Sequence, residues 1–165
     1  MKMVYCKKWN HVRKKPQDVL LEARARALHE NEEPYCIIFY KADGRLYRII
    51  EMCFINYYCN LLYYDELGRN TRRESFKLHG ERLWMRNTVD RFYAQDGKEV
   101  VAAYDILYEN DGTYKGIKYE SGQETTEEGR ANPKILYRDI PAFGAYQILF
   151  KNPPLPPFSK GGGGI

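Results

Sequence analysis

The sequence is poor in the residues that most enzymes use for nucleophilic or metal-assisted chemistry. Its 165 residues include only three serines and three histidines, and His11, His29 and His79 are too widely spaced to match a zinc pattern. No glycine-rich loop follows a strand and opens a helix, as a phosphate-binding loop would. The carboxylates gather in turn-forming segments rather than in pairs suited to acid–base work. We therefore predict a protein that is not an enzyme and uses neither a metal nor another cofactor.

Long apolar segments are also missing. The most apolar stretch, residues 49–64, is interrupted by Glu51, Asn56 and Asn60 and is too short to span a membrane. The opening MKMVYCKKWNHVRKKP has no apolar segment after its basic residues, so we expect no secretory signal and a cytoplasmic protein. The four cysteines should then stay reduced and pack as small hydrophobic side chains.

Tyrosine is the residue that the chain has in excess, with 15 copies. A tyrosine ring packs well on a pleated sheet, and its hydroxyl favours a hydrated edge. Asp-Gly pairs between apolar runs are typical of tight hairpins, because glycine accepts the positive φ that these turns require. Turn signals occur at residues 42–45, 66–69, 79–81, 95–98 and 110–113. The expected strands span residues 35–41, 45–65 (which is long enough to split near 56–60), 71–79, 81–94, 98–110, 113–120, 134–140 and 145–151.

One helix is predicted near the N-terminus. Pro16 suits a first helical position, strong helix formers follow, and Pro34 ends the segment. Leu21, Ala25 and Leu28 share one face at helical spacing. The acidic, polar segment 120–133 has no apolar period and is predicted to be a mobile loop. The fold class is thus α+β: an N-terminal helix packed on a long antiparallel β-meander, either curved or partly closed into a barrel.

Three parts of the chain are expected: a basic N-terminal arm (1–15), one α+β domain (16–151) and a disordered proline- and glycine-rich tail (152–165). The PPLPP of the tail could form a polyproline helix for an aromatic-lined groove. The tail also resembles a peptide that recurs at chain ends in bacterial genomes when a repeated intergenic element is read through. The second interpretation gives the tail no function.

Charge is unevenly distributed along the chain. Residues 1–30 carry eight Lys or Arg against three acidic residues, whereas residues 91–131 carry nine acidic residues against five basic ones. Such polarity fits a basic surface that meets a polyanion while another face stays acidic. A plain solvated tail is the alternative interpretation of the basic segment.

The segment RLWMRNTVDRFYAQ, residues 82–95, alternates arginines with aromatic rings. Cations neutralise phosphates and rings stack on bases, so single-stranded nucleic acid is one ligand for such a strand. The alternative is ordinary sheet, with Trp84 in the core and arginine stems lying over rings. The candidate residues for binding RNA or a partner are Lys7, Lys8, Arg13, Lys14, Lys15, Arg72, Arg73, Arg82, Trp84 and Arg86.

The segment from Arg73 to Gln95 resembles the middle of a small accessory subunit of type III-D CRISPR effector complexes. That family has an Arg-x-x-Phe strand, a turn, an acidic–Leu–Trp–Arg strand and an aromatic–Ala ending. The alignment contains a gap around Met85, and the resemblance implies association with guide RNA and neighbouring subunits, without catalysis by this chain. The matching positions are Arg73, Phe76, Glu81, Leu83, Trp84, Arg86, Phe92 and Ala94.

These observations favour a non-enzymatic accessory subunit that binds RNA or a protein–RNA assembly. Two alternatives belong to other classes. A tyrosine-rich meander that closed into a barrel could hold a small apolar or pigment-like ligand. An immunity or inhibitor protein could cover its partner by shape complementarity alone.

Overall fold

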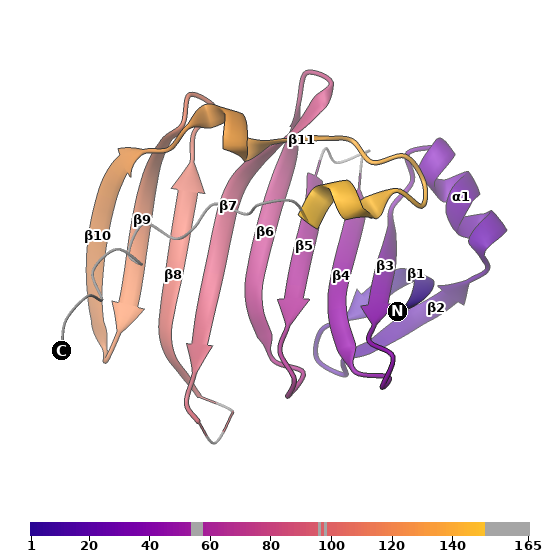
Figure 1. The fold of residues 1–165 in the computed structure, drawn as a ribbon, viewed down its shortest axis with the longest axis horizontal. Helices are drawn as coiled ribbons and strands as arrows, with labels where there is room; N and C mark the ends of the chain where they lie inside the picture. The colour runs from indigo at the N-terminus through magenta and orange to yellow at the C-terminus, as the bar shows by residue number, and fades with distance from the viewer. Residues whose placement is uncertain (54–57, 96, 98, 151–165) are drawn as a thin grey trace.

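The structure, a computed structural model, describes residues 1–53, 58–95, 97 and 99–150. Its strands form one antiparallel sheet in the order β10-β9-β8-β7-β6-β5-β4-β3-β1-β2, and β11 pairs with β7 beside that path. Figure 1 shows the sheet as one curved layer with helix α1 at its N-terminal end. The elements are β1 (Lys2–Asn10), β2 (Lys15–Leu20), α1 (Glu22–Glu30), β3 (Tyr35–Tyr40), β4 (Leu46–Cys53), β5 (Tyr58–Tyr64), β6 (Asn70–His79), β7 (Arg82–Tyr93), β8 (Val100–Tyr108), β9 (Thr113–Glu120), β10 (Gln123–Arg130) and β11 (Tyr137–Asp139).

The meander from β3 to β10 confirms the predicted hairpins. Aspartate side chains hold several turns by accepting backbone N–H groups: Asp43 accepts from Arg45 at 3.0 Å, and Asp111 accepts from Thr113 at 2.9 Å. The expected long strand 45–65 is split into β4 and β5, which pair with each other. Gly97 lies between β7 and β8, whereas Asp96 of the predicted Asp-Gly tip is outside the described residues.

The N-terminal residues are part of the sheet and do not form the separate arm that we expected for 1–15. Strand β1 pairs with β2 on one side and with β3 on the other. Its apolar side chains Tyr5, Cys6 and Trp9 are buried, while the lysines between them stay exposed. The segment is therefore a paired strand with buried apolar and exposed basic side chains, which the density of basic residues concealed.

The helix is shorter than predicted. Pro16 lies in β2 opposite Trp9, because an edge strand tolerates a residue that cannot donate a ladder hydrogen bond. Leu21 is the N-cap residue of α1 and is exposed, so only Ala25 and Leu28 of the predicted face are buried. The helix ends at Glu30, and Glu32 follows with a φ of 57°.

The segment predicted as a mobile loop, 120–133, contains the edge strand β10. Ser121 and Gly122 both have positive φ (52° and 75°), which is the geometry of a two-residue hairpin turn. The register with β9 then runs without a break from Gln123 to Arg130. Polarity misled the prediction, because an edge strand with two wet faces needs no apolar alternation.

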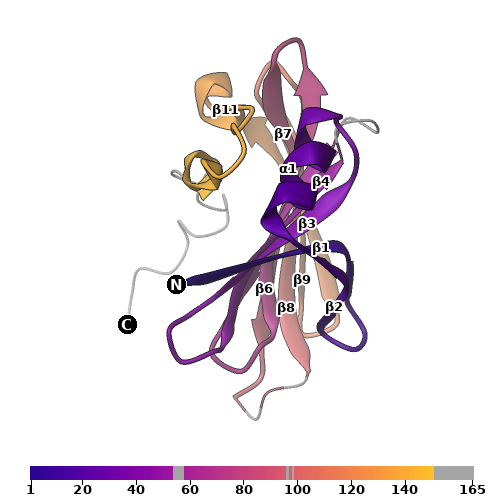
Figure 2. The same cartoon turned by 90° about the vertical axis from the view of Figure 1, so that its right-hand side faces the viewer.

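The C-terminal segment crosses one face of the sheet. It consists of the 3₁₀ turn η2 (Pro133–Leu136), strand β11 and the 3₁₀ turn η3 (Tyr146–Phe150), where two strands were predicted. Figure 2 shows this segment on the side of the sheet that we call the front face, with the β1–β2 hairpin folding toward the opposite back face. No helix among the described residues is long and apolar enough to cross a membrane.

Each face has its own core. The front core joins Ala25 and Leu28 of α1 and Tyr146 of η3 to apolar side chains from the strands. The back core is smaller and packs Trp9 against the sheet; its members are Cys6, Trp9, Cys36, Ile38, Ile49, Leu62 and Tyr64. Among the described residues, both faces of the sheet are therefore covered by apolar packing only near its N-terminal strands.

The meander does not close, so the expectation of a partly closed barrel is wrong. Strands β10 and β2 lie at opposite ends of the strand order. Both resist further pairing: β2 contains Pro16 and the positive φ of Asp18 (52°), and β10 carries Glu124, Glu127 and Glu128. A ligand-holding barrel consequently has no lumen in the described fold.

We expect Gly112→Ala to destabilise the protein more than Gly44→Ala. Both glycines have positive φ (91° and 82°), so alanine strains each turn by about 1 kcal/mol. A Cβ at position 112 would also collide with the carbonyl oxygen of Ala131, whereas one at position 44 meets no described atom within 4 Å. Urea unfolding should show an additional loss of about 1–3 kcal/mol for Gly112→Ala. Equal losses would contradict the packing of 131–133 on this turn.

Candidate nucleic-acid interface

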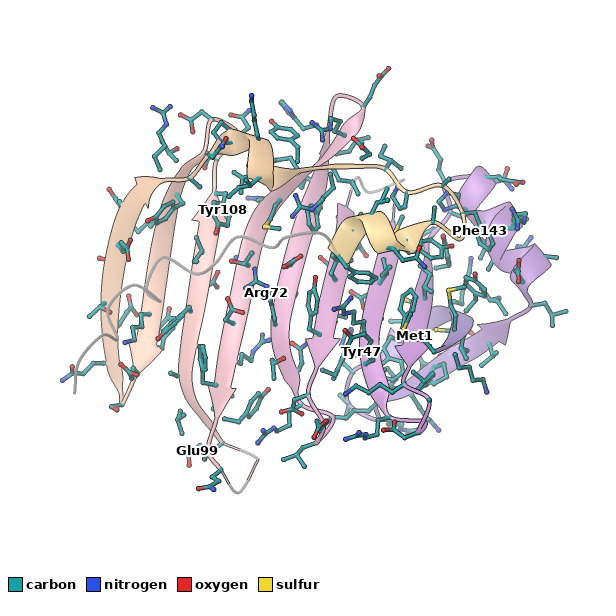
Figure 3. All side chains as sticks on the ribbon, in the orientation of Figure 1. Met1, Tyr47, Arg72, Glu99, Tyr108 and Phe143 are labelled. Carbon is teal, nitrogen blue, oxygen red and sulfur yellow. The ribbon has the colours of Figure 1, made fainter. Side chains whose placement is uncertain are left out.

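Arg72 lies on the front face and is committed to two carboxylates. Its Nε donates to Glu74 Oε1 at 2.8 Å, and its Nη1 donates to both oxygens of Asp90 at 2.9 and 2.8 Å. The hydroxyl of Tyr63 donates to the other oxygen of Glu74 at 3.1 Å. Figure 3 places Arg72 near the middle of the sheet. This cluster, which we call the front ion cluster, ties β5, β6 and β7 together.

In this cluster one guanidinium faces two carboxylates. Burial raises the pKa of Asp90, and the ion pair with Arg72 only partly offsets that effect. Burial also acts to lower the pKa of Arg72, but the carboxylates of Glu74 and Asp90 outweigh it and raise that pKa. A guanidinium held in this way is poorly placed to neutralise a phosphate. Arg72 therefore acts in the structure as a link between strands.

The other predicted binding residues of the β6–β7 hairpin do not share a surface with Arg72. Arg73, the next residue of β6, points to the back face, where it donates to Asn87 at 3.4 Å. Arg82 pairs with Asp139 at 3.1 Å near one end of β7. Arg86 is exposed in a β-bulge, because Phe76 pairs with Met85 and Ser75 pairs with Asn87. The hairpin thus spreads its cations over two faces and a bulge.

Trp84 is neither a fully buried core residue nor a fully exposed ring. Its side chain is half-buried and packs against the front core, and its ring makes an edge contact with His79 at 6.4 Å. Its Nε1 is buried and has no hydrogen-bond partner among the described residues. Trp84 pairs in register with Lys77 on β6 and Tyr137 on β11. The ring is chiefly a packing element.

The five basic residues of the predicted arm lie on the β1–β2 hairpin. Lys8, Arg13 and Lys15 are exposed. Lys7 forms a long, exposed ion pair with Glu33 at 3.5 Å. Lys14 reaches across the back face and donates to the carbonyl oxygen of Gly68 at 2.9 Å. The hairpin therefore carries its positive charge over the sheet rather than away from it.

A cleft of about 310 Å³ opens where this hairpin meets the sheet. We call it the hairpin cleft. His11 closes one side, with its Nε2 2.9 Å from Glu51 Oε1. The cleft is lined by His11 and Lys14 from the β1–β2 turn and by Leu62, Tyr64, Arg69, Asn70 and Tyr93 from the sheet. Its sheet residues come from β5, β6, β7 and the β5–β6 turn, which lie far from the hairpin in sequence.

Cations and rings alternate in the hairpin cleft. The guanidinium of Arg69 lies 4.8 Å from the centre of the Tyr93 ring and pairs with Asp65 at 2.6 Å. Beside it, Arg91 Nη1 donates to Asn70 Oδ1 at 2.6 Å, and the Tyr93 hydroxyl donates to the carbonyl oxygen of Asn70 at 2.9 Å. Asn70 thus holds a ring and a second cation at the same place.

The ring of Tyr64 is neutral at physiological pH. Burial raises the pKa of Tyr64 to about 12, although the nearby Arg91 acts in the opposite direction. Neutral phenol rings can stack on bases without repelling phosphates. Arg69 pairs with the carboxylate of Asp65, whereas Lys14 donates to the carbonyl oxygen of Gly68 and Arg91 donates to Asn70. The arrangement suits an anion with an attached flat ring.

Sequence reasoning found Lys14 but missed the sheet residues of the cleft. Arg69 belongs to a segment that was predicted only as a turn. Tyr64 and Tyr93 are two of 15 tyrosines, and no local pattern distinguishes them from the others. Among the residues that the structure describes, no group of three or more His, Cys, Asp or Glu side chains could hold a metal ion. Comparison with protein-family models, curated proteins and solved structures gave no match for this chain.

The neighbouring residues Arg72 and Arg73 provide a matched test of the front ion cluster. We expect Arg72→Met to lose about 3–5 kcal/mol of unfolding free energy at pH 7, because it strands two buried carboxylates. Arg73→Met should lose no more than about 1 kcal/mol, since its neighbour Asn87 is uncharged.

The two variants should also differ in pH dependence. Loss of Arg72 raises the pKa of Asp90 further, so the folded state binds a proton more tightly than the unfolded chain. Stability is then lost as pH rises through the folded-state pKa and is regained on acidification. Urea titrations between pH 7 and 5 measure this, and a deficit that stays constant with pH would contradict the role of Arg72.

Proposed function

We propose that this protein is a non-enzymatic accessory subunit that binds RNA, or a protein–RNA assembly, through the hairpin cleft. The observation that carries the proposal is the meeting of Lys14, Arg69 and Arg91 around the rings of Tyr64 and Tyr93. Phosphate neutralisation and base stacking are the two contacts on which sequence-tolerant binding of single strands depends.

A second cleft extends the basic surface along the same hairpin. It has a volume of about 300 Å³ and shares His11 with the hairpin cleft. Lys7 and Lys8 lie on its rim, and Tyr58, which is 37% exposed, adds another ring. A single-stranded RNA that lay along the β1–β2 hairpin would therefore meet cations and rings on both sides of His11. Arg13 and Lys15 lie on the same hairpin and would attract the backbone at longer range.

The other end of the sheet supports a place within an assembly. Strand β10 carries Glu124, Glu127 and Glu128 and is an open edge of the sheet. A polar molecule of this kind can turn its basic end toward RNA while its acidic end meets a protein subunit. The resemblance of residues 73–95 to the accessory subunit of type III-D CRISPR complexes names one assembly of this type. The exposed Arg82 and Arg86 would then be available to a neighbouring subunit or its RNA.

The test compares two charge-matched variants. Lys8→Gln with Lys14→Gln removes two cations from the cleft side, and Lys115→Gln with Lys134→Gln removes two exposed cations elsewhere. Affinity for a single-stranded RNA is measured by fluorescence anisotropy over a range of salt concentrations. The slope of log affinity against log salt should flatten by about 1.4 in the first variant, at about 0.7 per phosphate contact.

The control variant should keep the parent slope, because net charge alone does not place a phosphate. A parent affinity that ignores salt, or two variants that weaken binding equally, would contradict the hairpin cleft as an RNA site. Circular dichroism establishes that both variants are folded.

A further inference from the structure

Two of the four cysteines face each other across neighbouring strands. Cys6 of β1 and Cys36 of β3 are register partners, and both side chains belong to the back core. Register partners in an antiparallel pair have Cα atoms about 4.5–5.5 Å apart, which lies within the range of about 4.4–6.8 Å that a disulfide requires. Both thiols are free. The spacing of the two strands at this pair therefore suits a disulfide.

The two thiols are not equivalent. A hydrogen bond from the Cys36 thiol lowers the pKa of Cys6, and the same bond raises the pKa of Cys36, which donates it. Cys6 is therefore the better nucleophile of the pair, because the thiolate is the reactive form. Cys6 is fully buried, whereas Cys36 lines the second cleft beside Lys7 and Lys8, so a small oxidant would reach Cys6 past Cys36.

We propose that Cys6 and Cys36 are a redox-active dithiol that a hydroperoxide converts into an intrachain disulfide. The Cys6 sulfur attacks one peroxide oxygen, the O–O bond breaks, and water leaves with the thiol proton. Cys6 is then a sulfenic acid. The Cys36 sulfur next attacks the Cys6 sulfur, the S–O bond breaks, and a second water leaves. Two thiols and one hydrogen peroxide thus give one disulfide and two waters, and the two sulfurs together lose two electrons.

The remaining cysteines form an internal control. Cys59 pairs in register with Met52, to whose sulfur its thiol donates at 3.6 Å, while Cys53 pairs with Tyr58. Cys53 follows Met52 along β4, so Cys53 and Cys59 point to opposite faces of the sheet. Burial raises the pKa of Cys59. This second pair therefore lacks the geometry of the first.

The disulfide would act at the base of the basic hairpin. The register between β1 and β3 ends at Cys6, and from there β1 continues with β2 over the back face. In the thiol form Cys6 Sγ donates to the carbonyl oxygen of Lys8 at 3.2 Å. Oxidation removes that donor and links β1 covalently to β3 at the last residue where the two strands pair. This proposal does not depend on RNA binding.

The experiment treats the folded full chain with hydrogen peroxide, removes the oxidant with catalase, and alkylates remaining thiols in denaturant. Trypsin separates the pair into peptides 3–7 and 27–41, whereas both other cysteines fall in peptide 49–69. Mass spectrometry without reductant should show peptides 3–7 and 27–41 joined, with the loss of two hydrogen atoms. Reduction with dithiothreitol should separate them. Peptide 49–69 should carry two alkyl groups throughout.

Two variants identify the order of the steps. In Cys36→Ala the sulfenic acid of Cys6 has no partner, and dimedone should label peptide 3–7. In Cys59→Ala the joined peptides should form as in the parent. Four alkylated cysteines after peroxide treatment, earlier oxidation of peptide 49–69, or a link that forms only between two chains would each overturn the proposal.

Discussion

The position of Trp9 is the constraint on which the rest of the N-terminal half depends. Its indole is 2% exposed and packs into the back core with Leu62 and Tyr64 of β5. Burying a ring of that size contributes roughly 4–6 kcal/mol of transfer free energy. Because Trp9 lies on β1 two residues before His11, its burial pulls the β1–β2 turn onto the sheet. The hairpin cleft and the second cleft both follow from that packing.

The front ion cluster lies on a wide, open sheet whose front face is covered by only a few short segments. Apolar cover from α1, η2 and η3 gathers toward one end of the strands (Figure 1), and the centre of the face is filled by Arg72, Glu74 and Asp90. Ion pairs that satisfy one another can occupy a position that is neither dry nor fully wet. The front face is thus specialised for cohesion.

Local chemistry in the sequence was enough to predict most of the meander, and long-range effects account for what was missed. Asp43 and Asp111 fix their turns through contacts two residues away, so a short window contains the whole cause. Pro16 was assigned to a helix because its tolerance in an edge strand depends on where β1 lies. The cleft could not be predicted either, because Lys14 and Arg69 are far apart in the sequence and the packing of Trp9 brings them together. Arg86 is a smaller case: the resemblance contains a gap around Met85, and the strand has a one-residue bulge there.

Cys6 is the residue at which strand β1 stops pairing with β3. Before Tyr5, strand β1 pairs with β3 alone, and only Tyr5 and Cys6 pair with both β3 and β2. Beyond Cys6, β1 pairs with β2 alone, and the hairpin carries Lys8, Trp9 and His11 over the back face. The twist of a β-ribbon with one free side is larger than that of a strand held between two neighbours. The angle at which the basic hairpin crosses the sheet is therefore set over very few residues. A change in bonding at Cys6 would act on that angle directly, whereas a change at Cys59, in the interior of the meander, would not reach the hairpin.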